Sequence, residues 1–345
     1  MSITEKIYRE LKHRLENSYY QPGSRFPSEA VLADEFNVNK MTMNKIVSAL
    51  AGETYLVRGV RGAGTRVAEH NDCRPRGTVA FIAQLHPYET RILNGIIREC
   101  SQNNFTVVIE SPRPGDLLHR LRFLKNSGVK GIISAGFGTF EVPEGMIHFC
   151  LDYDPPRNGF PAATHFMNSD NFNGGKKLLH EVIRRGHKEI LIFSSERFVL
   201  NPSASVLPRV KGFFAAMSEA GIKDAEDRVF YGSSGSLADA RYFLEEYLKR
   251  FPETTIIVTD TDGSAELIHK AARQLGFSCP DRIALTGFGN VTMLPVATVD
   301  QDPERQGELA ARYLIRFQEQ GVPDEPVNEY VETELVAIEE IPINI

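Results

Sequence analysis

Residues 22–67 read PGSRFPSEAVLADEFNVNKMTMNKIVSALAGETYLVRGVRGAGTRV, and they contain two helix starts followed by a glycine-rich turn. Ser28 is a good N-cap because its hydroxyl oxygen can accept a hydrogen bond from the first helical turn, and the acidic residue after it suits the positive end of a helix. The cap predicts a first helix, in which we expect Val31, Leu32 and Phe36 to face inward.

A second helix start follows at Asn39, which can cap the next turn in the same way. The apolar residues after it recur at the i, i+3, i+4, i+7 spacing of one helix face, and they are Met43, Ile46, Val47 and Leu50. This spacing leaves four polar side chains on the exposed N-terminal turns, namely Lys40, Thr42, Asn44 and Lys45. Two cations and two hydrogen-bonding groups in that position are what a helix needs to contact the major groove of DNA.

A short hairpin is predicted after the second helix, with strands at residues 55–57 and 65–67. The glycines that permit a tight backbone path between them are Gly59, Gly62 and Gly64. The arginines on the hairpin are Arg58, Arg61 and Arg66. Basic side chains on such a turn can contact the phosphate backbone of DNA.

This N-terminal stretch resembles the winged helix-turn-helix of the GntR family of transcriptional regulators. The shared motifs are a Pro-Gly turn, a Pro-Ser-Glu helix start and a Gly-x-Gly-Thr wing, here Pro22-Gly23, Pro27-Ser28-Glu29 and Gly62-Ala63-Gly64-Thr65. The resemblance covers residues 3–68 and implies a DNA-binding domain over residues 1–68 whose partner is a double-stranded DNA operator. The residues it implies for DNA contact are Ser28, Asn39, Lys40, Thr42, Asn44, Lys45, Arg58, Arg61, Gly62, Gly64 and Thr65.

The length and charge of the chain point to a second, larger domain. A chain of 345 residues exceeds the usual size of one compact domain. The net charge of −6 is unevenly distributed, because residues 1–70 carry +2 and the remainder carries −8. We therefore expect DNA contact to be confined to the N-terminal domain.

Targeting and metal-binding patterns are not evident in the sequence. The N-terminus MSITEKIYRE has no apolar signal region, and no run approaches about 18 apolar residues. We therefore expect a cytoplasmic protein without membrane contact. The four cysteines are widely spaced and form no CxxC or Cys/His pattern, so we expect buried or incidental thiols in a reducing compartment and no metal site. We also expect no cofactor.

Residues 69–77 mix charged residues, asparagine and proline without apolar period, and we interpret them as a linker. From residue 78 to residue 345, short apolar runs alternate with amphipathic helical segments. One helix, residues 90–103, is expected to carry Ile92, Ile96 and Ile97 inward. This order predicts an α/β fold with parallel sheets, in which two similar halves in succession form two lobes and a ligand binds at the carboxyl ends of the strands.

The second domain resembles the LacI/GalR-type effector domain, which is related to periplasmic sugar-binding proteins. The motifs that carry this resemblance are Asn168-Ser169-Asp170, Arg185-Gly186-His187-Lys188-Glu189-Ile190, Arg209-Val210-Lys211-Gly212-Phe213, Asp262 and Asp300-Gln301-Asp302. It extends over roughly residues 77–340. A GntR-type DNA-binding domain joined to such an effector domain is the arrangement of the arabinose repressor group. This resemblance implies a homodimer that binds a small sugar-like effector between two lobes.

Carried over by position, the resemblance implies a set of effector-binding side chains, which are Gln84, His86, Tyr88, Glu89, Asp152, Arg209, Asp262 and Gln301. Carboxylates accept hydrogen bonds from sugar hydroxyls, Arg and Gln donate them, and Tyr88 or Phe137 can cover the apolar face of a sugar ring. The chain has Gly289 where the family often has an aspartate. Neutral sugars and sugar phosphates therefore both remain open as effectors.

The sequence thus predicts a bacterial transcriptional regulator, most simply a repressor, and not an enzyme. It has no Ser/His/Asp arrangement, no metal-ligand spacing and no P-loop. Two alternatives stay open, a cytoplasmic enzyme or a solute-binding protein, each with an accessory DNA-binding module.

Overall fold

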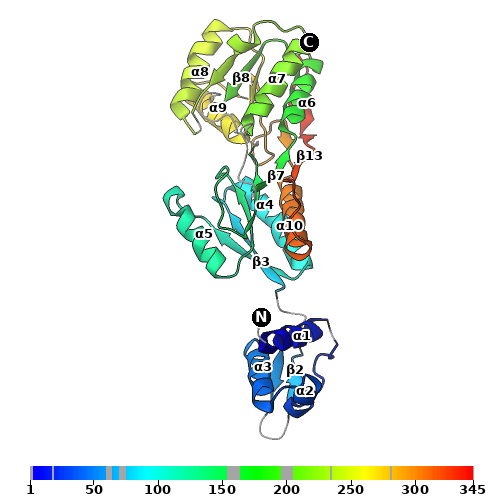
Figure 1. Ribbon diagram of the computed structural model, residues 1–345. Coiled ribbons are helices and arrows are strands. Elements are labelled where there is room, and N and C mark those ends of the chain that lie inside the picture. The colour runs from blue at the N-terminus through cyan, green and yellow to red at the C-terminus, as the bar shows by residue number, and fades with distance from the viewer. Residues whose placement is uncertain are drawn as a thin grey trace. The chain divides into compact units, whose positions relative to one another are not determined.

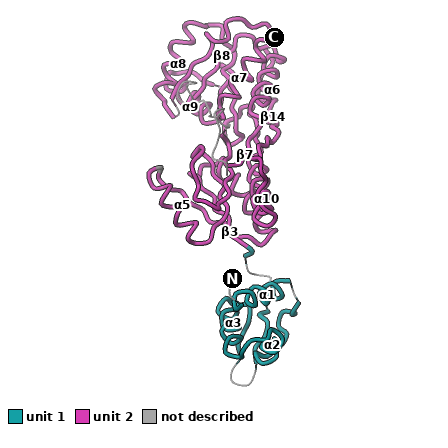
Figure 2. Tube along the Cα trace, in the orientation of Figure 1, with its two compact units in different colours: residues 1–76 teal, residues 77–345 magenta. Residues whose placement is uncertain are grey.

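A computed structural model describes residues 3–17, 19–59, 64–69, 75–153, 164–195, 205–233, 235–279 and 282–344. The chain divides into two compact units, residues 1–76 and residues 77–345 (Figure 2). The predicted linker, residues 69–77, lies partly outside the described residues, and Gly77 begins the first strand of the second unit. The domain boundaries stay a prediction.

The first unit is a small helical domain with a two-stranded hairpin. Its elements are α1 (Ile3–Glu16), α2 (Glu29–Glu35), α3 (Lys40–Gly52), β1 (Leu56–Arg58) and β2 (Thr65–Val67). The two strands are antiparallel, with Leu56 opposite Val67. Leu11, Leu32 and Leu50, one from each helix, are fully buried in a single core. The predicted winged helix-turn-helix is confirmed.

One side chain of α2 was predicted on the wrong face. Leu32 is fully buried and Phe36 packs against the core, but Val31 is 57% exposed. Successive residues of a helix are separated by a large angle, whereas residues four apart share a face. Leu32 and Phe36 therefore exclude Val31 from the core.

The second unit contains two α/β lobes. Lobe 1 has a six-stranded sheet of β3 (Gly77–Ile82), β4 (Phe105–Glu110), β5 (Gly131–Ala135), β6 (Ile147–Leu151), β7 (Thr164–Ser169) and β13 (Asn328–Val331). All its pairings are parallel, in the order β13-β7-β6-β5-β3-β4. Buried side chains place α4 (Pro87–Gln102) and α10 (Pro303–Gln320) on one face and α5 (Leu117–Asn126) on the other.

The helices α4 and α10 lie side by side in lobe 1 (Figure 1). A Cβ added at Gly95 would lie 1.9 Å from the carbonyl oxygen of Glu304, and one added at Gly307 would lie 2.1 Å from that of Ile92. The two backbones are therefore in direct contact. On the same helix, Ile97 is 42% exposed, so its predicted inward position was wrong. Ile92 and Ile96 are fully buried, as residues four apart on one helix face can be.

Lobe 2 has a four-stranded parallel sheet in the order β11-β10-β8-β9. These strands are β8 (Ile190–Ser194), β9 (Val229–Tyr231), β10 (Ile256–Thr259) and β11 (Ala284–Thr286). One face is covered by α6 (Asn171–Arg184) and α7 (Val206–Glu219), and the other by α8 (Leu237–Arg250) and α9 (Asp262–Gln274). The predicted α/β class with parallel sheets is confirmed.

The two lobes are not two successive halves of the chain, as was expected from the sequence. After lobe 2 the chain returns to lobe 1 to add α10 and β13, and then ends against lobe 2, where Ile341 is fully buried. In the part of the chain that the structure describes, three segments therefore connect the lobes, and we call them the hinge: residues 169–171, residues 298–302 and residues 331–334. A small antiparallel pair is formed by β12 (Thr298–Asp300), which lies in the second of these segments, and β14 (Glu334–Val336), which begins at the end of the third.

Hydrogen bonds join the three hinge segments to one another. Ser169 donates from its hydroxyl to the carbonyl of Gln301 at 3.1 Å, and the amide of Asp170 donates to the carbonyl of Val331 at 2.8 Å. The segments that connect the two lobes are therefore held together by hydrogen bonds. Within the described ranges, no helix is both long enough and apolar enough to cross a bilayer.

Candidate functional site

Two helix caps position the predicted DNA-contacting face of the first unit. The hydroxyl of Ser28 accepts from the amide of Val31 at 3.3 Å, and Oδ1 of Asn39 accepts from the amide of Thr42 at 2.7 Å. Both side chains thus perform the capping role that their types favour. Because capping occupies these acceptor atoms, any contact of the two residues with DNA would have to use their remaining groups.

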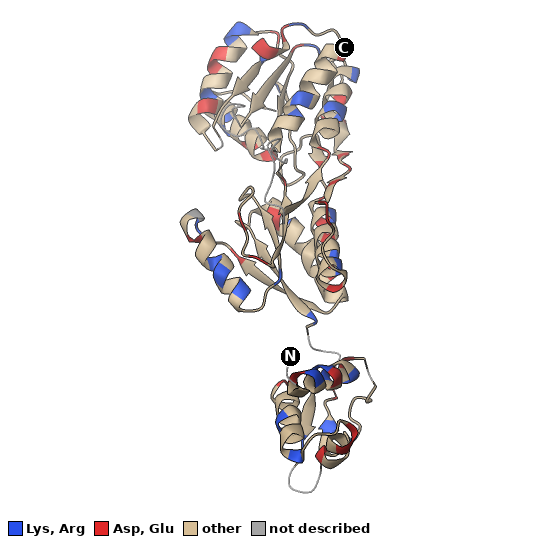
Figure 3. Cartoon of the chain, in the orientation of Figure 1, with Lys and Arg blue, Asp and Glu red and all other residues tan. Residues whose placement is uncertain are grey.

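Charge is segregated between the two helices that follow the caps (Figure 3). The helix α3 carries Lys40 and Lys45 and no acidic residue, whereas α2 carries three acidic residues and no basic one. Both lysines are exposed, and Thr42 is half-buried beside them. The N-terminal turns of α3 therefore present the positive surface that contact with a phosphate backbone requires.

Glu29 organises this face. Its place in the sequence, at the start of a helix, predicted only a favourable interaction with the helix dipole. Oε1 of Glu29 accepts from Nδ2 of Asn44 at 2.9 Å and from an Nη2 donor of Arg58 at 3.1 Å. Arg58 also donates to the hydroxyl of Ser48 at 2.9 Å. Glu29 therefore fixes α2, α3 and the first hairpin strand together, and two of the predicted DNA contacts are bound to it in the absence of DNA.

The hairpin turn is only partly described. Gly64 adopts φ of +73°, and its carbonyl accepts from the amide of Gly59 at 2.9 Å. Thr65 begins the second strand and is half-buried. Arg61 and Gly62, which were predicted to contact DNA, lie outside the described residues.

The second unit contains a pocket of about 730 Å³ at the carboxyl ends of strands from both sheets. Its lobe 1 side includes the ends of β5 and β6 and the first turn of α4, and its lobe 2 side includes the ends of β8, β10 and β11. Six of the predicted effector-binding residues line it, namely Tyr88, Glu89, Asp152, Arg209, Asp262 and Gln301. The expected meeting of strand ends from two lobes is therefore present.

Two predicted residues do not line the pocket. The side chain of Gln84 donates to the carbonyl of Pro112 at 3.2 Å. His86 is the N-cap of α4, and its amide donates to Oε2 of Glu89 at 3.3 Å. Both residues are exposed, and neither forms part of the pocket wall.

Arg209 is the cation at the base of the pocket, and it is 3% exposed. Its Nε donates to Oδ1 of Asn171 at 2.9 Å, and Nη1 donates to the carbonyl of Asp260 at 2.9 Å. The guanidinium carbon lies 4.3 Å from the centroid of the Phe288 ring. These contacts fix the guanidinium plane. The remaining group, Nη2, donates to the hydroxyl of Ser205 at 3.4 Å and lies 3.8 Å from Oδ1 of Asp152.

Asp152 has one carboxylate oxygen that accepts no hydrogen bond from the described residues. It follows β6 in a left-handed conformation, with φ of +55°. Its Oδ1 atom is buried, and none of the described residues hydrogen-bonds to it. A buried carboxylate oxygen without a donor is costly, so a hydroxyl of a bound molecule would be stabilising at this position.

Asp262 lines the pocket but already has several donors. Its Oδ1 accepts from the hydroxyl of Thr298 at 2.7 Å, and its Oδ2 accepts from the amides of Val291 and Thr292 at 2.6 and 3.1 Å. A Cβ at Gly287 would lie 2.1 Å from the same carboxylate. Asp262 therefore holds the loop after β11 in place, whatever it contributes to a ligand.

A buried amide cluster connects the pocket with the hinge. Nε2 of Gln301 donates to Oδ1 of Asn171 at 3.1 Å, and Nε2 of Gln306 donates to the hydroxyls of Tyr88 and Ser169 at 3.0 and 2.8 Å. Burial, followed by the charge of Asp152, raises the pKa of Tyr88. The Tyr88 phenol is therefore neutral and can donate a hydrogen bond into the pocket.

The neighbouring carboxyl group, Glu89, is half-buried, and burial raises its pKa above the usual value. It lies on the same helical turn as Tyr88 and also faces the pocket. A hydroxyl-rich ligand could hydrogen-bond to it in either protonation state.

Sequence reasoning missed several residues of the pocket wall, and these are Gly136, Gly138, Thr139, Tyr153, Ser195, Ser205, Val206 and Phe288. Most of them lie in loops that follow strands, where short polar residues carry little signal of their own. Phe137, which was considered as a cover for a sugar ring, does line the pocket. Among the described residues, no cluster of His, Cys, Asp or Glu is arranged to hold a metal ion.

Comparison with known proteins places both units in known classes. Residues 3–67 match the family of bacterial regulatory proteins, gntR family, and residues 179–337 match the periplasmic-binding-protein-like domain. The regulator CelR of Thermobifida fusca is 24% identical over 300 residues, which are 81% of this chain and 84% of that protein. The arabinose metabolism transcriptional repressor of Geobacillus stearothermophilus is 23% identical over 330 residues, which are 87% of this chain and 86% of that protein.

The fold of this chain is also similar to that of a regulator whose structure has been solved. The structure of a transcriptional regulator CelR–cellobiose complex superimposes with a TM-score of 0.64 at 20% sequence identity, and it covers 90% of this chain and 98% of that one. Taken with the two family matches, this likeness agrees with the helical first unit and the two-lobed second unit. The chain therefore carries a bacterial regulatory domain of the gntR family followed by a periplasmic-binding-protein-like domain.

Proposed function

We propose that this protein is a bacterial sequence-specific transcriptional regulator, a repressor, whose DNA binding is controlled by a neutral sugar-like effector in the pocket between the lobes. The observation that carries the proposal is the presence, in one chain, of a gntR-type domain with exposed lysines on α3 and of a polar pocket lined by both lobes. Relatives that match most of the chain are named as regulators of transcription or of arabinose metabolism.

The chemistry of the pocket favours a neutral sugar over a sugar phosphate. Of the lining residues that the structure describes, one is basic, Arg209, and three are acidic, Glu89, Asp152 and Asp262. A phosphate would bring negative charge beside these carboxylates, whereas hydroxyl groups can both donate to carboxylates and accept from Arg209. Phe137 and Phe288 supply aromatic surface for the apolar face of a sugar ring.

In the proposed mechanism the protein acts in the cytoplasm as a homodimer on a near-palindromic operator and has no catalytic role. Two copies of α3 would enter successive major grooves, with the lysines and the wing contacting phosphates. The effector would favour one angle between the lobes, change the geometry of the dimer and thereby change the spacing of the two recognition helices.

The decisive experiment uses DNA that the full-length protein itself selects from a random-sequence library, followed by anisotropy titrations at several salt concentrations. The double variant Lys40→Ala, Lys45→Ala should bind this DNA at least tenfold more weakly. The slope of log affinity against log salt should become shallower by about one for each phosphate that the lysines no longer neutralise. Lys270→Ala, an exposed lysine of the second unit, is the control. The proposal fails if no sequence is enriched, or if cellobiose, arabinose and other neutral sugars all leave the affinity for the selected DNA unchanged.

A further inference from the structure

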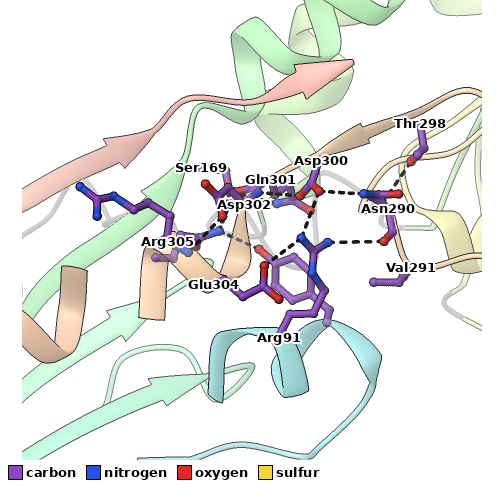
Figure 4. Close-up of polar contacts among 12 residues, drawn as sticks. Arg91, Ser169, Asn290, Val291, Thr298, Asp300, Gln301, Asp302, Glu304 and Arg305 are labelled. Atoms are coloured by element: carbon purple, nitrogen blue, oxygen red, sulfur yellow. Dashed lines mark hydrogen bonds and ion pairs between the residues drawn. The ribbon is translucent and has the colours of Figure 1, made fainter. Parts of the chain in front are cut away.

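Arg91 connects the two lobes beside the pocket without lining it (Figure 4). It belongs to α4 of lobe 1, and its Nη1 donates to the backbone carbonyl of Asn290, in the loop after β11 of lobe 2, at 3.4 Å. Its Nη2 donates to Oδ2 of Asp300 in the hinge at 3.0 Å and to Oε2 of Glu304 on α10 at 3.4 Å. One guanidinium group therefore contacts lobe 1, lobe 2 and the hinge.

The loop that Arg91 reaches is held by other polar contacts as well. Nδ2 of Asn290 donates to Oδ2 of Asp300 at 2.7 Å, and the next two amides, Val291 and Thr292, donate to Asp262. Asn290 has φ of +53°, a conformation that asparagine tolerates better than most residues. The loop of residues 289–292 is thus fastened on one side to the pocket carboxylate and on the other to the hinge and Arg91.

Both ends of this connection form part of the pocket wall. Tyr88 and Glu89 line the lobe 1 side from the first turn of α4, less than one turn before Arg91. Gly289 and Val291 line the lobe 2 side from the loop. A group that fixes the distance between α4 and this loop therefore fixes the distance between two opposite walls of the pocket.

The side chains that form the contact between Arg91 and Asp300 are largely shielded from solvent, which strengthens their interaction. The side chains of Arg91 and Asp300 are 23% and 19% exposed. Burial opposes ionisation of Asp300, yet hydrogen bonds from Asn290 and Arg91 hold its pKa below the usual value. Charge-assisted hydrogen bonds in partly buried positions are stronger than those on open surfaces.

We propose that Arg91 is a positioning residue for the effector, which fastens α4 to the loop of residues 289–292 and so sets the separation of the pocket walls. The proposal rests on the proposed function, in which the effector acts through the angle between the lobes. No role for Arg91 was predicted from the sequence, because its partners are about 200 residues away in the chain.

The test compares hydrogen exchange in the full-length wild type, Arg91→Ala, Arg91→Lys and Arg98→Ala. Arg98 is an exposed arginine of the same helix and serves as the control. The amides of Val291 and Thr292 are hydrogen-bonded, so their exchange reports opening of the loop. Arg91→Ala should raise their exchange rates about tenfold, Arg91→Lys should recover part of the protection because it keeps a cation near Asp300, and Arg98→Ala should resemble the wild type.

Two results would overturn the proposal. One is unchanged loop exchange in Arg91→Ala, and the other is a uniform rise in exchange over both sheets of the second unit, which would indicate only a general loss of stability. Calorimetric titration with cellobiose and arabinose adds a binding arm, in which a sugar that the wild type binds should bind Arg91→Ala at least fivefold more weakly. A wild type that binds neither sugars nor selected DNA would refute the proposed function, while the exchange comparison would still decide the role of Arg91.

Discussion

The Nε atom of Arg209 donates a hydrogen bond to Oδ1 of Asn171 at 2.9 Å, which joins the base of the pocket to the hinge segment of residues 169–171, where α6 begins. Asn171 is also bonded to the hinge residue Gln301 through the same oxygen, at 3.1 Å. A ligand that moves the guanidinium group of Arg209 would therefore act directly on two of the three segments that connect the lobes.

We expect Arg209→Lys to destabilise the second unit and weaken effector binding together. Lysine keeps the charge but cannot donate to Asn171 and to the carbonyl of Asp260 with the fixed geometry of a guanidinium group. Losing these charge-assisted hydrogen bonds should cost about 3 kcal/mol, visible as a lower melting temperature by circular dichroism. Arg98→Lys, on an exposed part of α4, is the matched control. A melting temperature equal to that of the wild type would contradict the role assigned to the Arg209 contacts.

Asp152→Asn should separate effector binding from stability. Asparagine has nearly the same shape and tolerates the positive φ of this position. Only the long ion pair with Arg209, at 3.8 Å, is lost, so the ligand-free melting temperature should change little. The loss of the carboxylate charge should weaken binding of a neutral sugar by about tenfold, or about 1.4 kcal/mol, because Oδ1 has no hydrogen-bond partner among the described residues. Titration calorimetry measures this difference, and equal affinities would exclude Asp152 from the effector contacts.

The elements that sequence reasoning predicted well are those set by local chemistry. Ser28 and Asn39 cap α2 and α3 as their types and positions indicate, and fully buried strands such as β5 and β6 appear as short apolar runs. Caps and apolar periodicity depend on neighbours within about one helical turn or one strand. The sequence contains all of that information in contiguous form.

The features that were missed depend on contacts between distant parts of the chain. Glu29 has the sequence signature of a helix start. Its hydrogen bonds with Asn44 and Arg58 form only when α2, α3 and β1 pack together. The helix α10 was not predicted, although Asp302 caps it and Pro303 occupies its first turn, signals that favour a helix start. Its omission led directly to the wrong expectation of two successive halves.

Stability of lobe 1 should fall as the pH is lowered from about 6.5, because of the buried imidazole of His148. The ring is fully buried, its Nε2 lies 2.8 Å from the hydroxyl of Ser134, and it stacks on Phe140 at a centroid distance of 4.4 Å. Burial, and secondarily the charge of His165, lowers the pKa of His148 to about 3. The unfolded chain therefore binds a proton at higher pH than the folded chain does.

The sign and size of the effect follow from that difference. The contribution of His148 is complete above pH 6.5 and is lost progressively as the pH falls towards 3, with about 2 kcal/mol lost between pH 6.5 and 4.5. Melting temperatures recorded over this range should fall less steeply in His148→Gln than in the wild type, although the variant is less stable at pH 8. His119→Gln removes a histidine from the exposed side of α5 and controls for the change of residue type. Parallel pH profiles for the wild type and His148→Gln would contradict the prediction.

Gly95→Ala should disrupt the contact between α4 and α10 and destabilise lobe 1 by about 1–3 kcal/mol or more, in the range found for overpacked cores. The new methyl group would lie 1.9 Å from the carbonyl oxygen of Glu304 and 2.9 Å from the amide nitrogen of Glu308, and both are backbone atoms that cannot move aside like the tip of a side chain. The two helices must then separate. Gly115→Ala is the matched control because a Cβ there meets nothing within 4 Å and its φ is not positive. Because α10 follows directly after the hinge and α4 carries Tyr88 and Glu89, the separation of the helices should also weaken sugar binding. An unchanged melting temperature in Gly95→Ala would contradict the prediction and show that the helices can move apart at little cost.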